Sequence, residues 1–157
     1  MEHKDAPVLF QILDDNIKRS NRLGDFECPD IIELPYWDVR YILPEKVMQG
    51  FDSVSEHFVK NISTFTQAEK ISFYFWIKDE LQEVAKMERE ALTPLKANVN
   101  KKYRQSPRAR EYWYLIELDN LSGGCPIKKQ QIKQMKYSEV FETLLANVIK
   151  SEGEWIK

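Results

Sequence analysis

The chain has 157 residues, of which 43% are hydrophobic, 12% aromatic and 31% charged, and its formal net charge is −2 at pH 7. This composition excludes a disordered polymer, and the length suits one compact core, so we expect a single helical domain over residues 1–157. The small net charge conceals a polarised distribution, because residues 96–136 carry ten basic and three acidic side chains, a net of +7, while the remaining residues carry −9.

The sequence indicates a cytoplasmic location without membrane contact. The longest mainly apolar stretch, residues 71–77, is much shorter than the roughly 18 residues that a membrane span needs. Residues 1–5 contain two acids and lack the basic start and apolar run of a signal peptide. Cys28 and Cys125 are isolated from each other and from any metal-binding spacing, so we expect two thiols in a reducing cytoplasm or in a particle assembled there.

The first elements are a predicted helix and a predicted arm. Residues 6–23 have helical apolar spacing, with a proline near the start and Gly24 after the end. Residues 25–44 contain three prolines among many apolar and aromatic side chains, so we expect an extended arm rather than a helix. The arm could lie across the chain's own helices or dock on another subunit, and its candidate partner-binding residues are Tyr36, Trp37 and Tyr41.

Two further helices follow the arm. Residues 44–62 place apolar side chains along one helical face and predict a continuous second helix. Thr66 and Glu69 have the spacing of a capping box, which predicts a third helix from there to residue 93. The acids of its second half are expected to form a solvated face paired with neighbouring cations. They are Asp79, Glu80, Glu83, Glu88 and Glu90.

The C-terminal third predicts three more helical segments. Ser106 and Pro107 suit the start of a helix that ends at the glycine pair after Ser122. A further helix should begin at Pro126, break near Tyr137 and resume to about residue 149. No segment has the alternation of a long strand. We therefore expect an all-α, irregular bundle of about five or six helices with the extended arm at its N-terminal side.

The sequence offers no constellation of catalytic or metal-binding residues. Histidine occurs only at His3 and His57, so the Glu-x-x-His pairs of a di-iron bundle are missing, and His57 is expected to sit at the edge of the core. Neither cysteine has a neighbouring histidine, and no Gly-x-Ser-x-Gly turn or phosphate-binding glycine loop occurs. We expect a protein that is not an enzyme and needs no cofactor.

The basic segment, residues 96–136, is the clearest functional signal. It could pair with the chain's own acidic helix, bind an acidic protein partner, or contact the phosphates of a nucleic acid. Its candidate binding residues are Lys101, Lys102, Arg104, Arg108, Arg110, Lys128, Lys129 and Lys133. The expected function is that of an interaction protein, a subunit or adaptor of a larger assembly such as a phage particle, with a protein partner or further copies of itself. A helical nucleic-acid-binding protein is the alternative.

Overall fold

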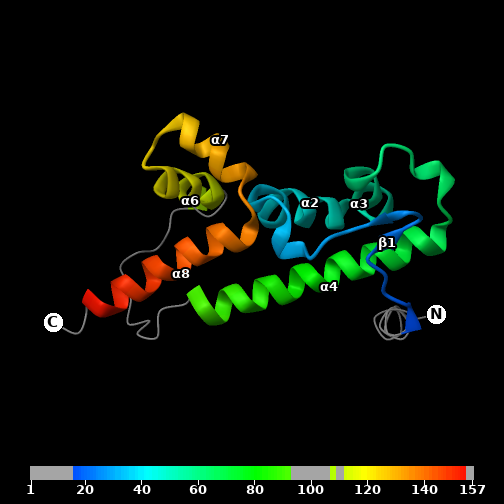
Figure 1. Cartoon of the computed structure of the whole chain (residues 1–157), viewed down its shortest axis with the longest axis horizontal. Coiled ribbons are helices and arrows are strands. Elements are labelled where there is room, and N and C mark those ends of the chain that lie inside the picture. The colour runs from blue at the N-terminus through cyan, green and yellow to red at the C-terminus, as the bar shows by residue number, and fades with distance from the viewer. Residues whose placement is uncertain (1–15, 93–106, 109–111, 155–157) are drawn as a thin grey trace. The chain divides into compact units, whose positions relative to one another are not determined.

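The computed structural model describes residues 16–92, 107–108 and 112–154, and within them the protein is almost entirely helical (Figure 1). The all-α prediction is confirmed, with six α-helices in the described residues. The chain forms two compact units, one of Met1–Cys28 with Lys46–Asp79 and one of Pro29–Glu45 with Glu80–Lys157. Whether both units fold as one cooperative domain stays a prediction.

The first unit begins with a small hairpin where a helix was expected. Strand β1, Arg22–Leu23, pairs antiparallel with strand β2, Phe26–Glu27. Gly24 between them has a φ of 61°, a conformation that glycine adopts without the strain a Cβ atom brings. The predicted helix over residues 6–23 is therefore wrong at its C-terminal end, and residues 6–15 lie outside the described residues.

Three aromatic rings pack together at the centre of the first unit. The centroid of Phe58 is 5.6 Å from that of Phe26 and 5.3 Å from that of Phe73. Phe73 is fully buried, as are Leu23 of the hairpin and Val54. The hairpin is thus held on helices of its own unit by apolar burial. Val54 and Phe58 lie on the apolar face that the spacing over residues 44–62 predicted, and both side chains face this core.

The predicted second helix is divided in two by a glycine. Helix α2 covers Leu43–Gln49 and α3 covers Phe51–Phe58, and Gly50 between them has a φ of 113°. An α-helix cannot continue through that conformation, so the prediction of one helix over residues 44–62 is wrong. A short 3-10 turn, η3, follows at Ile62–Thr64.

Helix α4, Gln67–Leu92, matches the predicted third helix closely. Its start has the predicted capping box, because the Glu69 carboxylate accepts from the Thr66 amide at 2.8 Å and the Thr66 hydroxyl accepts from the Glu69 amide at 3.2 Å. The bond from the Thr66 amide, and to a lesser extent the bond that the Thr66 hydroxyl donates to the same carboxylate, lower the pKa of Glu69. The first half of α4 belongs to the first unit and the second half to the second unit.

In the second unit, two distant chain segments are joined by backbone hydrogen bonds. After the 3-10 turn η1, Ile31–Glu33, an isolated antiparallel bridge links Pro35 to Lys136. The Tyr36 amide donates to the Met135 carbonyl at 2.7 Å, and the Tyr137 amide donates to the Leu34 carbonyl at 2.9 Å. These bonds fix the junction between two C-terminal helices against residues of the predicted arm.

The second half of the predicted arm is helical rather than extended. Helix begins at Tyr36, passes through a π-helical turn, η2, at Asp38–Ile42, and continues into α2 past Pro44. Proline has no amide hydrogen, and in an α-helix its ring would clash with the carbonyl four residues earlier. The wider π turn, closed by a bond from the Leu43 amide to the Asp38 carbonyl, removes that conflict. Ile31, Tyr36 and Val39 are buried, so these arm residues belong to the protein's own core.

The C-terminal helices follow the predicted order. Helix α6 covers Trp113–Ser122, and Gly123 ends it in the left-handed conformation, as predicted. Helix α7, Pro126–Gln134, begins with the predicted proline, and α8, Tyr137–Glu154, follows the predicted break. Helices α6 and α7 pack against each other. The predicted N-cap at Ser106 lies outside the described residues.

The contact between Gly24 and Phe65 can be tested against a matched glycine. A Cβ atom at Gly24 would lie 2.4 Å from the Phe65 ring, whereas one at Gly123, with nearly the same φ of 59°, would meet no atom within 4 Å. Both alanine substitutions should cost about 1 kcal/mol of backbone strain, and Gly24→Ala should cost a further 1–3 kcal/mol or so from overpacking. Equal losses in denaturant unfolding would contradict this packing.

Candidate functional site

A buried polar cluster links four elements of the second unit. Arg40 of the π-helical turn donates to Glu88 of α4 through one terminal nitrogen and to Glu117 of α6 through the other, the latter at 3.4 Å. The side chains of Arg40, Glu88 and Glu117 are 21%, 9% and 20% exposed. Glu88 was predicted to lie on a solvated face, and that prediction is wrong because the π turn brings a cation and buried rings onto this side of α4.

Tyrosine hydroxyls complete the hydrogen bonding of both carboxylates. Tyr137 of α8 donates to Glu88 at 2.7 Å, and Tyr36 donates to Glu117. Both tyrosines have no exposed surface. We refer to the set Tyr36, Arg40, Glu88, Glu117 and Tyr137 as the buried cluster. The buried cluster contains two carboxylates and one guanidinium, and its hydrogen bonds connect the π-helical turn, α4, α6 and α8.

Burial controls the ionisation of this cluster. It raises the pKa of Glu88, although the Tyr137 hydroxyl and the Arg40 guanidinium act in the opposite direction. Burial also raises the pKa values of Tyr36 and Tyr137, and that of the adjacent Tyr41 to about 12. For Arg40 burial acts to lower the pKa, and the two carboxylates more than restore it. Arginine therefore stays charged and the phenols stay neutral at physiological pH.

A second, partly exposed group consists of aromatic rings. The centroids of Trp37 and Tyr41 are 4.4 Å apart, and Tyr114 of α6 lies 5.2 Å from Tyr41. The Lys133 ammonium of α7 sits over the Trp37 ring at 4.1 Å, which is a cation–π contact. Of the three aromatic arm residues proposed from the sequence for partner binding, Trp37 and Tyr41 thus keep some surface, and Tyr36 keeps none.

The lysines of the α7 region divide into paired and unpaired ones. Lys129 pairs with Asp119 of α6, and Lys136 pairs with Glu33 at 2.5 Å, which raises the pKa of Lys136. Lys128 and Lys133 form no ion pair with any described acidic residue. Arg108 is exposed. The other predicted basic residues, Lys101, Lys102, Arg104 and Arg110, lie outside the described part of the chain.

Exposed apolar side chains gather in the same region. Seven large hydrophobic side chains are exposed among the described residues, and five of them fall within residues 112–135, which we call the α6–α7 surface. They are Tyr112, Leu115, Ile116, Ile127 and Met135. Ile127 is 71% exposed and is followed directly by the exposed Lys128. The sequence indicated this region as a binding surface by its positive charge alone.

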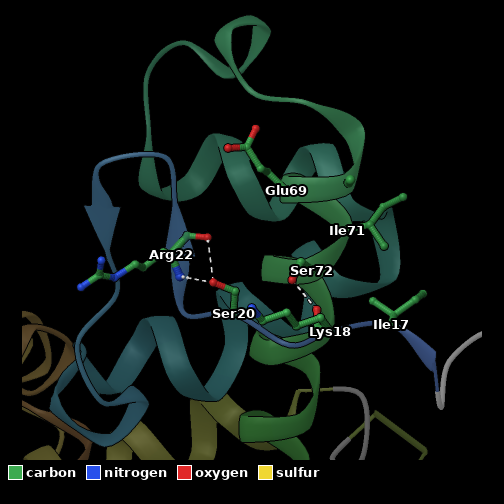
Figure 2. A pocket seen from close by; sticks show the side chains of 8 residues that line it. Ile17, Lys18, Ser20, Arg22, Glu69, Ile71 and Ser72 are labelled. Atoms are coloured by element: carbon green, nitrogen blue, oxygen red, sulfur yellow. Dashed lines mark hydrogen bonds between the residues drawn. The ribbon is translucent and has the colours of Figure 1, made fainter.

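The first unit has a cleft of about 600 Å³ between the start of α4 and the segment before β1 (Figure 2). The two serine hydroxyls of its lining are already engaged, because the Ser72 hydroxyl donates to the Lys18 carbonyl and the Ser20 hydroxyl contacts the Arg22 backbone. Glu69 belongs to the capping box of α4. The remaining walls include Ile17 and Ile71. No nucleophile–base pair lines the cleft, so its geometry carries no catalytic proposal.

The described residues hold no group of three or more metal-ligating side chains, and no described helix is both long and apolar enough to cross a membrane. Neither cysteine is in a disulfide. His57 packs edge to face on Phe58, with 4.9 Å between the ring centroids. These observations leave the buried cluster and the α6–α7 surface as the features from which a function can be argued.

No family model, curated protein or solved structure matches the chain.

The bond from Tyr137 to Glu88 should contribute measurably to stability. Tyr137→Phe removes a hydroxyl that is hydrogen-bonded to the Glu88 carboxyl group, and leaving a buried polar group without a partner costs about 1–3 kcal/mol. Tyr74→Phe is the control, because Tyr74 donates to the neutral Val47 carbonyl at 3.2 Å and should cost about 0.5–1.5 kcal/mol. Denaturant unfolding of both variants measures the difference, and a smaller loss at Tyr137 would refute the role of this bond.

Cys125 should react faster than an ordinary thiol near neutral pH. Cys125 is the N-cap residue of α7, and the backbone N–H groups of Lys128 and Ile127 in the first turn of that helix lower the pKa of its thiol, although the sulfur makes no hydrogen bond of ordinary cap geometry. Cys28 is only 1% exposed and should stay unmodified in the folded protein. Iodoacetamide labelling followed by peptide mass spectrometry across a pH series should place the midpoint of Cys125 below that of a free cysteine peptide. A coincident midpoint would show that the start of α7 does not stabilise the thiolate.

Proposed function

We propose that this chain is a non-enzymatic interaction protein, a subunit or adaptor of a larger assembly, and that the α6–α7 surface docks an acidic protein partner. The observation that carries the proposal is the concentration of exposed apolar side chains within residues 112–135. These side chains lie on or next to α6 and α7, which pack against each other, and exposed apolar patches on a folded protein are typical of sites that another molecule covers. Scattered exposed hydrophobic residues would carry no such meaning.

Charge decides which kind of partner suits this surface. Lys129 is neutralised by Asp119, but Lys128 and Lys133 have no acidic partner among the described residues. Apolar side chains next to uncompensated cations favour a protein surface that offers both apolar and acidic groups. A nucleic acid would use the cations and leave Leu115, Ile116 and Ile127 without a contact, which is why we favour the protein partner.

The adjacent aromatic group extends the same surface. Trp37 and Tyr41 lie beside Tyr114 of α6, and Lys133 of α7 covers the Trp37 ring. Tryptophan and tyrosine supply large contact areas at a small cost in side-chain entropy. The docking role that the sequence suggested for the arm is therefore retained in this proposal for Trp37 and Tyr41 only.

The proposal is tested by photocrosslinking in the full-length chain. A photoreactive phenylalanine analogue at position 127 should form an adduct with an acidic protein, or with a second copy of the chain. The same analogue at Met48, which is 88% exposed on α2, should not form that adduct. Lys128→Glu should weaken the adduct at position 127, because it repels an acidic partner. Lys60→Glu, at an exposed lysine of the first unit, is the matched control.

Two outcomes contradict the protein-docking proposal. Identical adducts at positions 127 and 48 would show unspecific contact. An adduct that nuclease treatment removes, together with binding whose affinity falls steeply with salt, would establish the nucleic-acid alternative instead.

A further inference from the structure

The buried cluster contains more negative than positive charge. Glu88 and Glu117 both contact the single guanidinium of Arg40, and among the described residues no second cation contacts either carboxylate. With both glutamates ionised the cluster would carry a net charge of −1 in a setting where each of these side chains is at most 21% exposed. An uncompensated buried charge is costly, and binding a proton is the least expensive way to remove it.

The two carboxylates differ in solvent exposure, and this difference determines which of them binds the proton. The Glu88 side chain is 9% exposed and that of Glu117 is 20% exposed, so water stabilises a negative charge better on Glu117. The groups that face Glu88 are Arg40 from the π-helical turn, Tyr137 from α8 and, across Arg40, Glu117 from α6. Tyr36 and Tyr41 lie beside Glu117 and Arg40 and stay neutral.

We propose that the folded second unit binds a proton on the carboxyl group of Glu88, which makes the attachment of the π-helical turn to α4 sensitive to pH. The protonated carboxyl can donate to the Tyr137 oxygen, so that the hydroxyl changes from donor to acceptor, while the other carboxyl oxygen still accepts from Arg40. Arg40 then balances the charge of Glu117 alone. This inference concerns the core of the second unit and does not depend on the docking surface.

The direction of the pH effect follows from the raised pKa of Glu88. A group whose pKa is higher in the folded than in the unfolded state stabilises the fold fully below its unfolded value, and this contribution is lost as the pH rises through the folded value. The second unit should therefore become less stable as the pH rises from about 4.5, the ordinary glutamate region, through the value that Glu88 has in the fold.

The test needs no variant in its first part. A pH titration of the glutamate side-chain carboxyl carbons by NMR should show Glu88 titrating at a higher pH than a glutamate in an unfolded peptide. Tyr137→Phe should move the Glu88 midpoint further upward, because it removes a donor to the charged form. A Glu88 signal that titrates at the same pH as glutamate in an unfolded peptide would overturn the proposal.

The second part measures stability in the full chain by hydrogen exchange of α8 amides. Glu88→Gln mimics the protonated carboxyl, so the stability of this variant relative to the wild type should increase as the pH rises. The ratio of the two opening constants should change tenfold for each unit by which the folded and unfolded pKa values of Glu88 differ. Glu83→Gln, at an exposed position, should give a constant ratio. A constant ratio for Glu88→Gln would also overturn the proposal, and if that variant fails to fold, the wild-type titration decides alone.

Discussion

The second unit depends on one interaction, the burial of Arg40 between Glu88 and Glu117. A guanidinium is expensive to remove from water, and the cost is offset here because its two terminal nitrogens contact carboxyl groups whose other oxygens are hydrogen-bonded to tyrosines. Removing any one member leaves the rest buried and unsatisfied. The cluster therefore fixes the positions of the π-helical turn, α4, α6 and α8 relative to one another within this unit more specifically than apolar packing alone would.

The π-helical turn makes this interaction possible. It allows a helix to run through Pro44, and it also carries Arg40 on the side that faces Glu88. Helical insertions of this kind are frequent at functional sites. In this protein the turn also leaves Trp37 and Tyr41 partly exposed beside α6 and α7. The same distortion thus supports the core and contributes to the surface on which the proposed function rests.

The two proposals concern different parts of the second unit and can fail separately. The docking proposal depends on the exposure of Ile127 and Lys128, whose side chains contribute little to the fold. The proton-binding proposal depends on Glu88, which is 8% exposed. The first unit contains the packed phenylalanines and the cleft at the start of α4, and neither proposal depends on it.

The sequence alone determined the features that depend on near neighbours. Capping at Thr66, the glycine stop after α6 and the proline start of α7 involve residues within one helical turn, so local patterns predicted them correctly. Only the tertiary structure decided the π-helical turn before Pro44 and the burial of Glu88. The burial of Glu88 depends on contacts between residues far apart in the chain, 48 positions in the case of Arg40 and Glu88. A helical pattern predicts that a charged residue is exposed to solvent. The periodicity contains no information about a partner on another element that would allow the residue to be buried.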